Sequence, residues 1–279
     1  MHTHGYRPDL LDAPLARALG IATVTTLHGS SLIGGTSALH EWLQLRLLGR
    51  SDAVVAVSRQ IVEDLRKTRV PPARVHCIPN GWVASAEPLP RDEARTDLGL
   101  APSGMVIGWV ARLIPVKACD IFLRAFSACR GLPVVAAIIG EGPEKSRLEA
   151  LRAELRLEEQ VKFCGARGQA GRLFTAFDGF VLSSRSEGTP ITLLEAMAAG
   201  VPVVTTAVGG IPDVVGPNEA LLVPPEDPVA LGAAIRQLID DPAAGRARAQ
   251  AATRRLNDEF SADRWLASHE TMYRSIRKR

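Results

Sequence analysis

The chain has 279 residues, of which 46% are hydrophobic and 23% charged, a balance typical of a globular protein with room for two hydrophobic cores. Its small formal net charge of +3 and its 5% aromatic content argue against a dedicated nucleic-acid partner. The sequence has no apolar run long enough to span a bilayer and no secretion signal, so we expect a cytoplasmic location.

Short apolar segments alternate with amphipathic helical segments along most of the sequence, which predicts parallel sheets. Because the apolar runs are continuous, helices should cover both faces of each sheet, as in a doubly wound α/β fold. The predicted strands are Thr23–Leu27, Ala53–Val57, Val75–Ile78, Val106–Val110, Val134–Ile139, Val161–Phe163, Phe180–Leu182, Val203–Thr205 and Leu221–Val223.

The strand rhythm breaks at residues 87–91, where two prolines and two charges predict a linker between domains. We place a first domain at residues 1–88, with three predicted strands, and a second at 89–258, with six. The last stretch, 259–279, has apolar residues at helical spacing, and that pattern alone allows it to pack on either domain.

Neither the cysteines nor the basic residues indicate a special site. The positive charges that enrich residues 46–74 are interleaved with acidic ones, which favours a plain solvated surface over a membrane-binding one. The four cysteines form no Cys-x-x-Cys pair and read as small buried hydrophobic residues: Cys77, Cys119, Cys129 and Cys164.

Three histidines of the first domain bear on function: His28 and the pair His2 and His4. His28 directly follows a predicted strand, although a lone histidine is more often a surface or core residue than a functional one. His2 and His4 form a His-x-His pair, but a metal site would need a third ligand, and none is in view. We therefore expect no metal.

Two cations follow the first strand of the second domain, in the segment Gly108–Lys117. Arg112 offers a planar fork of donors and Lys117 a mobile point charge, a combination that suits a diphosphate, although loop cations are usually just solvated. Gly140 and Gly142 follow the next strand and would let the backbone approach a ligand, which by itself is weak evidence.

The segment Ser184–Val204 sets two carboxylates, Glu187 and Glu195, around one strand-to-helix turn. We predict a helix at 190–199, with Pro190 as its first residue and Thr189 as its cap. Free amides at the start of this helix would attract an anion. The pattern favours a nucleotide diphosphate as ligand over two solvated surface charges.

Together these motifs resemble the retaining GT-B glycosyltransferases of family four, also called glycosyl transferases group 1. Glu187 and Glu195 fit the family's Glu-x7-Glu pair, and Arg112 and Lys117 fit its Gly-Arg-Leu-x-x-x-Lys-Gly element. The chain departs from that element at Ala111 and at Ala118, which replace glycines; we expect Ala118 to reshape the loop and displace Lys117 slightly.

The resemblance implies two Rossmann-like domains of the GT-B type, the first incomplete, with the helix at 259–279 crossing back to the first. It implies a retaining transfer of a sugar from an NDP-sugar to a sugar, lipid-linked or other small acceptor, without a metal, in cell-envelope polysaccharide or glycolipid synthesis at the inner membrane face. The residues implied in catalysis are Arg112, Lys117, Glu187 and His28, and those implied in donor binding are Glu195, Gly188, Thr189, Pro190, Ile191, Gly140 and Gly142.

Two other functions stay open on the sequence. The opening strands of the family's first domain have no counterpart here, so a truncated fragment that binds nucleotide sugars with little turnover is the main alternative. A GT-B-shaped epimerase ranks last, because its usual acid and base residues are not recognisable. The nucleotide base, the sugar and the acceptor are not fixed by these motifs.

Overall fold

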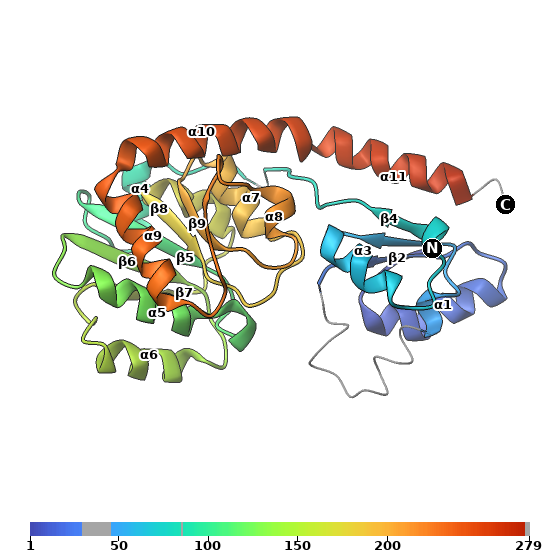
Figure 1. Cartoon of the computed structure of the whole chain (residues 1–279), viewed down its shortest axis with the longest axis horizontal. Helices are drawn as coiled ribbons and strands as arrows, with labels where there is room; N and C mark the ends of the chain where they lie inside the picture. Colours follow the sequence, from blue (N-terminus) through green and yellow to red (C-terminus); the bar gives the residue numbers. More distant parts are fainter. Residues whose placement is uncertain (30–45, 85, 277–279) are drawn as a thin grey trace.

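The computed structural model describes residues 1–29, 46–84 and 86–276, which form two lobes around two parallel sheets (Figure 1). The first lobe holds a sheet of four strands in the order β1-β2-β3-β4. These strands are β1 (His2–His4), β2 (Val24–Leu27), β3 (Ala53–Ala56) and β4 (Val75–Cys77). Its helices are α1 (Tyr6–Ala18), α3 (Arg59–Arg66) and the 3-10 turn η1 (Pro72–Arg74).

The first sheet corrects the prediction of three strands, because β1 is a fourth. It pairs in parallel with β2, from His2 opposite Val24 to His4 opposite Thr26. β1 escapes the search for apolar runs because it has three polar residues, of which only Thr3 is buried.

The second lobe holds a sheet of six strands in the order β10-β9-β8-β5-β6-β7. The chain therefore fills one half of the sheet outward from β5 and then crosses to β8 on the other side, which makes the carboxyl ends of β5 and β8 the switch point where ligands usually bind in such sheets. The strands are β5 (Met105–Val110), β6 (Val134–Ile139), β7 (Val161–Gly165), β8 (Gly179–Leu182), β9 (Val203–Thr206) and β10 (Leu221–Val223).

Helices cover both faces of the second sheet, as the continuous apolar strands predict. Alternate side chains of β5 enter two separate cores: Val106 and Val110 face one, Ile107 and Trp109 the other. The helical elements are α4 (Arg91–Asp97), η2 (Pro115–Lys117), α5 (Cys119–Phe126), η3 (Ser127–Cys129), α6 (Lys145–Glu154), η4 (Ala170–Ala176), α7 (Ile191–Ala198), α8 (Ile211–Val214), α9 (Pro228–Asp240) and α10 (Pro242–Glu259).

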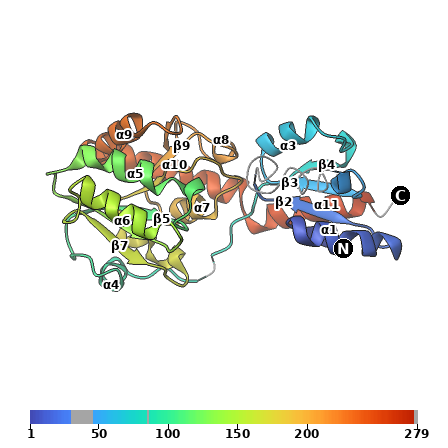
Figure 2. The same cartoon turned by 90° about the horizontal axis from the view of Figure 1, so that it is seen from below.

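The last helix, α11 (Ala262–Ile276), lies on the first lobe (Figures 1 and 2). Its Met272 is buried among Val24, Val55 and Ile78 of the first lobe. The chain thus passes from the end of α10 back to the first sheet, and Trp82 donates its amide hydrogen to the carbonyl of Phe260 where the two connections meet.

Three of the four cysteines are buried, as predicted: Cys119, Cys129 and Cys164. The prediction is wrong for Cys77, which is exposed because β4 is an edge strand that the helices do not cover fully. Burial raises the pKa of the Cys129 thiol to about 11, so this group stays protonated at neutral pH. Within the described ranges, no helix combines the length and apolar character needed to cross a membrane.

Candidate active site

The loops that carry the predicted site residues leave the carboxyl ends of strands in both sheets. His28 follows β2, Lys117 follows β5, and Glu187 follows β8. The two sets of loops touch directly: the Thr189 hydroxyl donates to the carbonyl oxygen of Val57 at 2.6 Å, across the boundary between the lobes. The loops that carry the predicted residues of the two lobes therefore meet at one boundary.

Lys117 and Glu187 form an ion pair on the second-lobe side of this boundary. The Lys117 ammonium donates to both carboxylate oxygens of Glu187, at 2.7 and 2.8 Å. The Ser184 hydroxyl donates to the same carboxylate at 2.6 Å, and the Glu187 side chain is only 6% exposed. The structure thus brings together two residues that lie 70 positions apart, and each neutralises the other in a partly dry setting.

Arg185, for which the sequence predicts no role, joins the Lys117 loop to the Glu187 loop. Its guanidinium makes a bidentate pair with Asp120 at 3.1 and 3.0 Å and also donates to the carbonyl of Pro115. Its backbone amide donates to the carbonyl of Val116 at 2.8 Å. The pairing holds the pKa of the Asp120 carboxyl below its usual value, against the effect of burial.

Ala118 keeps the geometry that a glycine would have. Its backbone has φ 51° and ψ 43°, in the left-handed region, and the side chain is fully buried. Lys117 nonetheless reaches Glu187 at 2.7 Å, so alanine here does not divert the lysine from the site. The left-handed conformation costs an alanine about 1–2 kcal/mol, which the surrounding contacts offset.

Arg112 lies in the loop after β5, and Gly140 and Gly142 pack against the backbone of that loop. Arg112 is exposed, and within the described part of the chain no ion-pair partner is found for it. A Cβ at Gly140 would overlap the carbonyl oxygen of Ala111, and one at Gly142 the carbonyl oxygen of Leu113. The glycines therefore bring two loop backbones into contact, which fixes the base of the Arg112 loop.

Glu195 lies half-buried on α7, against the 3-10 turn η4. A Cβ at Gly171 would stand only 2.7 Å from its Oε1 atom. Among the described residues its carboxylate has no hydrogen-bond partner, and burial raises its pKa to about 7. Glu195 is therefore a desolvated acceptor without a partner, unlike the paired carboxylate of Glu187.

The start of α7 differs from the prediction. The helix begins at Ile191, Pro190 stands at the capping position, and no side chain caps it. Thr189 is not the cap, because its hydroxyl is bound to Val57 in the other lobe. Ile191 is 46% exposed, so the first turn of α7 leaves an apolar side chain at the surface.

His28 lies at the end of a row of stacked histidine rings. Its Nε2 atom is 2.8 Å from Nδ1 of His4, and the two rings are stacked with centroids 5.1 Å apart. His4 in turn stacks on His2, at 4.6 Å. Burial, and secondarily the neighbouring His4, lowers the pKa of His28, so the ring is neutral at pH 7.

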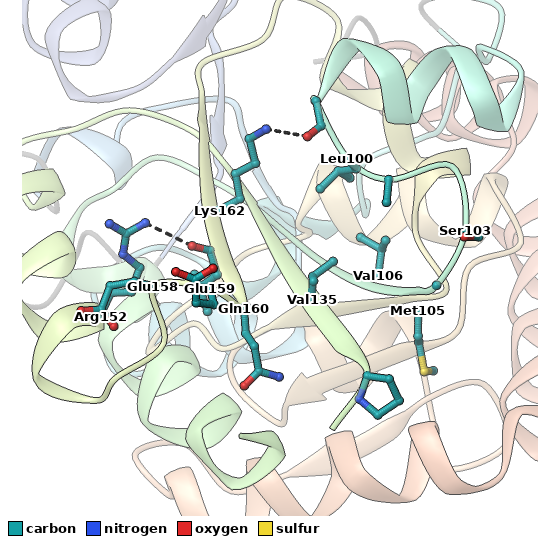
Figure 3. Close-up of a pocket in the computed structure, with 15 residues that line it drawn as sticks. Leu100, Ser103, Met105, Val106, Val135, Arg152, Glu158, Glu159, Gln160 and Lys162 are labelled. Atoms are coloured by element: carbon teal, nitrogen blue, oxygen red, sulfur yellow. Dashed lines mark hydrogen bonds between the residues drawn. The ribbon is translucent and has the colours of Figure 1, made fainter. Parts of the chain in front are cut away.

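A separate hollow lies at the opposite end of the second sheet (Figure 3). It is bordered by Met105, Val135 and Lys162, near the amino ends of β5, β6 and β7. The Lys162 ammonium donates to the carbonyl of Gly99 at 2.6 Å, so the cation is already engaged. Because ligands of such sheets usually bind at the carboxyl ends of the strands, the candidate site is the boundary between the lobes and not this hollow. Within the described residues, no group of three His, Cys, Asp or Glu side chains is arranged to hold a metal.

Two family models match the chain. Residues 90–255 match the model described as glycosyl transferases group 1, and residues 1–83 match the one described as Glycosyltransferase Family 4. The chain is 26% identical, over 99% of its length and 74% of the relative, to the N-acetyl-alpha-D-glucosaminyl L-malate synthase of Bacillus anthracis. It is 37% identical to the D-inositol 3-phosphate glycosyltransferase of Mycobacterium marinum, over 60% of the chain.

Among solved structures, the fold is similar to that of the Anabaena protein HepE in complex with UDP-glucose, with a TM-score of 0.88 and 22% sequence identity. That likeness covers 100% of this chain and 79% of HepE. The match to the mycobacterial glycosyltransferase spans 39% of that protein's length.

Proposed function

Because the chain belongs to the glycosyl transferases group 1, whose model matches residues 90–255, we propose that it transfers a sugar from an NDP-sugar donor to a small acceptor with retention of configuration. The observation that carries the proposal is the Lys117–Glu187 pair, with a 2.7 Å contact, at the switch point of the second sheet and against the first lobe. Further support comes from Glu195, a half-buried carboxylate on the helix that follows the Glu187 loop.

The donor's diphosphate would lie against Lys117 and Arg112. An ammonium has three N–H donors, and Glu187 accepts two close contacts from Lys117, so a further N–H is available to a phosphate oxygen. Arg112, exposed in the same loop after β5, would add a planar fork that matches a phosphate. In this proposal the two cations stabilise the negative charge that develops as the nucleoside diphosphate leaves.

Glu195 would bind the ribose of the donor nucleotide. A carboxylate can accept hydrogen bonds from two neighbouring hydroxyl groups, and each bond to a charged group contributes roughly 1.5–3 kcal/mol. Because Glu195 has no hydrogen-bond partner among the described residues, ribose hydroxyls would satisfy a desolvated group rather than break an existing contact.

Glu187 and His28 would flank the donor sugar from the two lobes. Retention would follow if the diphosphate departs and the acceptor hydroxyl enters on the same face of the sugar. For the acceptor we infer a sugar, a lipid-linked sugar or another small polar molecule. A role in cell-envelope polysaccharide or glycolipid synthesis, at the inner membrane face, rests on the family resemblance.

The test is a donor panel with a matched variant. The purified chain is titrated by calorimetry with UDP, GDP and ADP, and released nucleotide is followed with the corresponding sugar donors and candidate acceptors. We expect one nucleotide to bind and Glu195→Gln, which keeps the shape but removes the charge, to weaken it by about tenfold. Retention is read from the anomeric coupling of the product by NMR.

A pH series sharpens this test. Since Glu195 has a pKa of about 7, it ionises as the pH rises through neutrality, and the affinity of the wild type should rise with it. The ionisation of the phosphates affects both proteins alike, so the difference between wild type and Glu195→Gln isolates the carboxyl. Equal affinities at pH 8 would contradict the ribose-binding role, and inverted product would contradict retention.

A further inference from the structure

Thr189 is held by the first lobe through both its side chain and its backbone. The hydroxyl donates to the carbonyl of Val57, just after β3, at 2.6 Å, and the Asn80 side-chain amide donates to the Thr189 carbonyl at 3.1 Å. Thr189 is 5% exposed. Residues that follow two separate strands of the first sheet therefore hydrogen-bond to one residue of the second lobe.

Near these hydrogen bonds, the backbones of the two lobes are in direct contact. A Cβ at Gly188 would overlap the carbonyl oxygen of His28, so no side chain stands between the lobes at that point. A second contact lies nearby, where Asp213 of α8 accepts a hydrogen bond at 2.7 Å from the amide of Arg59, the first residue of α3. The carboxylate thus meets the positive end of a helix from the other lobe.

These contacts surround the backbone of Glu187. Its carbonyl accepts a hydrogen bond from Gly210 at 3.2 Å, and Gly210 belongs to the turn that leads into α8 and Asp213. Glu187 is two residues before Thr189, with Gly188 between them. A displacement of the first lobe would therefore move the segment that sets the position of the Glu187 carboxylate.

We propose that Thr189 and Asn80 are positioning residues: their hydrogen bonds across the lobe boundary hold the Glu187 loop in its donor-binding geometry and so link donor affinity to the contact between the lobes. This inference deepens the proposed function and rests on it. By reciprocity, a donor that needs the ordered loop also stabilises the contact between the lobes.

The test compares one substitution at two threonines. Thr189→Val removes the hydroxyl and keeps the branched shape. Thr253→Val is the matched control, because the Thr253 hydroxyl donates to the carbonyl of Met197 at 2.7 Å entirely within the second lobe. Calorimetry with UDP, GDP and ADP measures nucleotide affinity, and small-angle scattering of the unliganded proteins measures the radius of gyration.

Thr189→Val loses the hydrogen bond to the Val57 carbonyl and the longer one, at 3.5 Å, from the Asn80 backbone amide. We expect it to weaken nucleotide binding by roughly three- to tenfold and to increase the radius of gyration. Thr189→Ser, which keeps the hydroxyl, should restore both, and Thr253→Val should change neither. Asn80→Asp, which replaces the donating amide by an acceptor, should act like Thr189→Val and covers the case in which that variant fails to fold.

The outcomes separate the two proposals. A wild type that binds none of the three nucleotides contradicts the proposed function, and the scattering data still decide the role of Thr189. Wild-type affinity in Thr189→Val, or an unchanged radius of gyration, would overturn the positioning role even when the proposed function holds.

Discussion

On the second-lobe side of the boundary between the lobes, Lys117 and Glu187 form an ion pair at 2.7 Å, and Arg185 joins their loops through a bidentate pair with Asp120. On the first-lobe side, partial burial lowers the pKa of His28, and its ring contacts His4 at the end of a short strand. Charged contacts within one lobe are stronger than contacts of neutral rings. The second lobe thus carries a preformed charge site, which its own contacts hold in place. The first lobe contributes neutral groups where the two lobes touch.

The two sides also respond to pH in opposite directions. Burial lowers the pKa of His2 to about 4, with His4 and His269 adding to the effect, whereas burial raises the pKa of Glu195 to about 7. Lowering the pH therefore adds an unfavourable positive charge at His2 in the first lobe and removes the negative charge of Glu195 in the second. A single pH change can separate the two sides experimentally.

The largest expected effect breaks the charge site itself. Lys117→Ala should slow transfer by roughly 10²- to 10³-fold, because it removes a cation from the developing charge of the leaving group. It also leaves Glu187, 6% exposed, without its counter-ion. Steady-state kinetics with the donor found in the panel would measure the loss.

A double variant separates these two consequences. Glu187→Gln combined with Lys117→Met removes both charges and restores the neutrality of the pair. If Lys117 acts on the donor, the double variant stays slow; recovery of transfer to near the level of Glu187→Gln alone would mean that Lys117 only neutralises Glu187.

A smaller effect should appear in the first lobe. Between pH 6.5 and about 4 the unfolded chain binds a proton on His2 that the folded protein excludes, so this group contributes stability above pH 6.5 that is lost as the pH falls. His2→Asn should therefore lower the melting temperature less at pH 5 than at pH 7. A difference in melting temperature that is the same at both pH values would contradict this linkage.

Much of the fold follows from the sequence, for identifiable reasons. The nine predicted strands all exist to within about two residues, because most of them are short runs of apolar and β-branched residues with a break on either side. The two-sheet architecture of the family is confirmed by the family models and by the structural likeness. The strand β1 was missed because only one of its three side chains is buried.

At the candidate site, the local sequence pattern predicts where residues lie along the chain but not which distant residues they contact. Sequence spacing placed Lys117 and Glu187 at strand ends, and topology then brought them together. The sequence pattern also predicted that Thr189 caps α7, whereas its hydroxyl donates to the carbonyl of Val57 in the other lobe. The Arg185–Asp120 pair joins residues 65 positions apart, and nothing in either local sequence marks the partner.

The smallest expected effect concerns the alanine that replaces a glycine of the family element. Ala118→Gly relieves a left-handed backbone, worth about 1–2 kcal/mol, but it also loses a buried methyl group, worth about 0.8 kcal/mol, and gives the unfolded chain more freedom, worth about 0.5–1 kcal/mol. These terms nearly cancel, so we expect the free energy of unfolding to change by less than about 1 kcal/mol. Transfer should be unaffected, because Lys117 already reaches Glu187.

Gln169→Gly is the matched control for this prediction. Gln169 has a similar left-handed backbone, with φ 56°, but its side chain is exposed, so glycine relieves the strain there without removing a buried group. Gln169→Gly should therefore stabilise the protein more than Ala118→Gly does, by about the value of one buried methyl group. If denaturant unfolding shows Ala118→Gly to be the more stabilising of the two, the loop around Lys117 is more strained than its contacts imply, and the charge site is less preformed than the comparison of the two sides suggests.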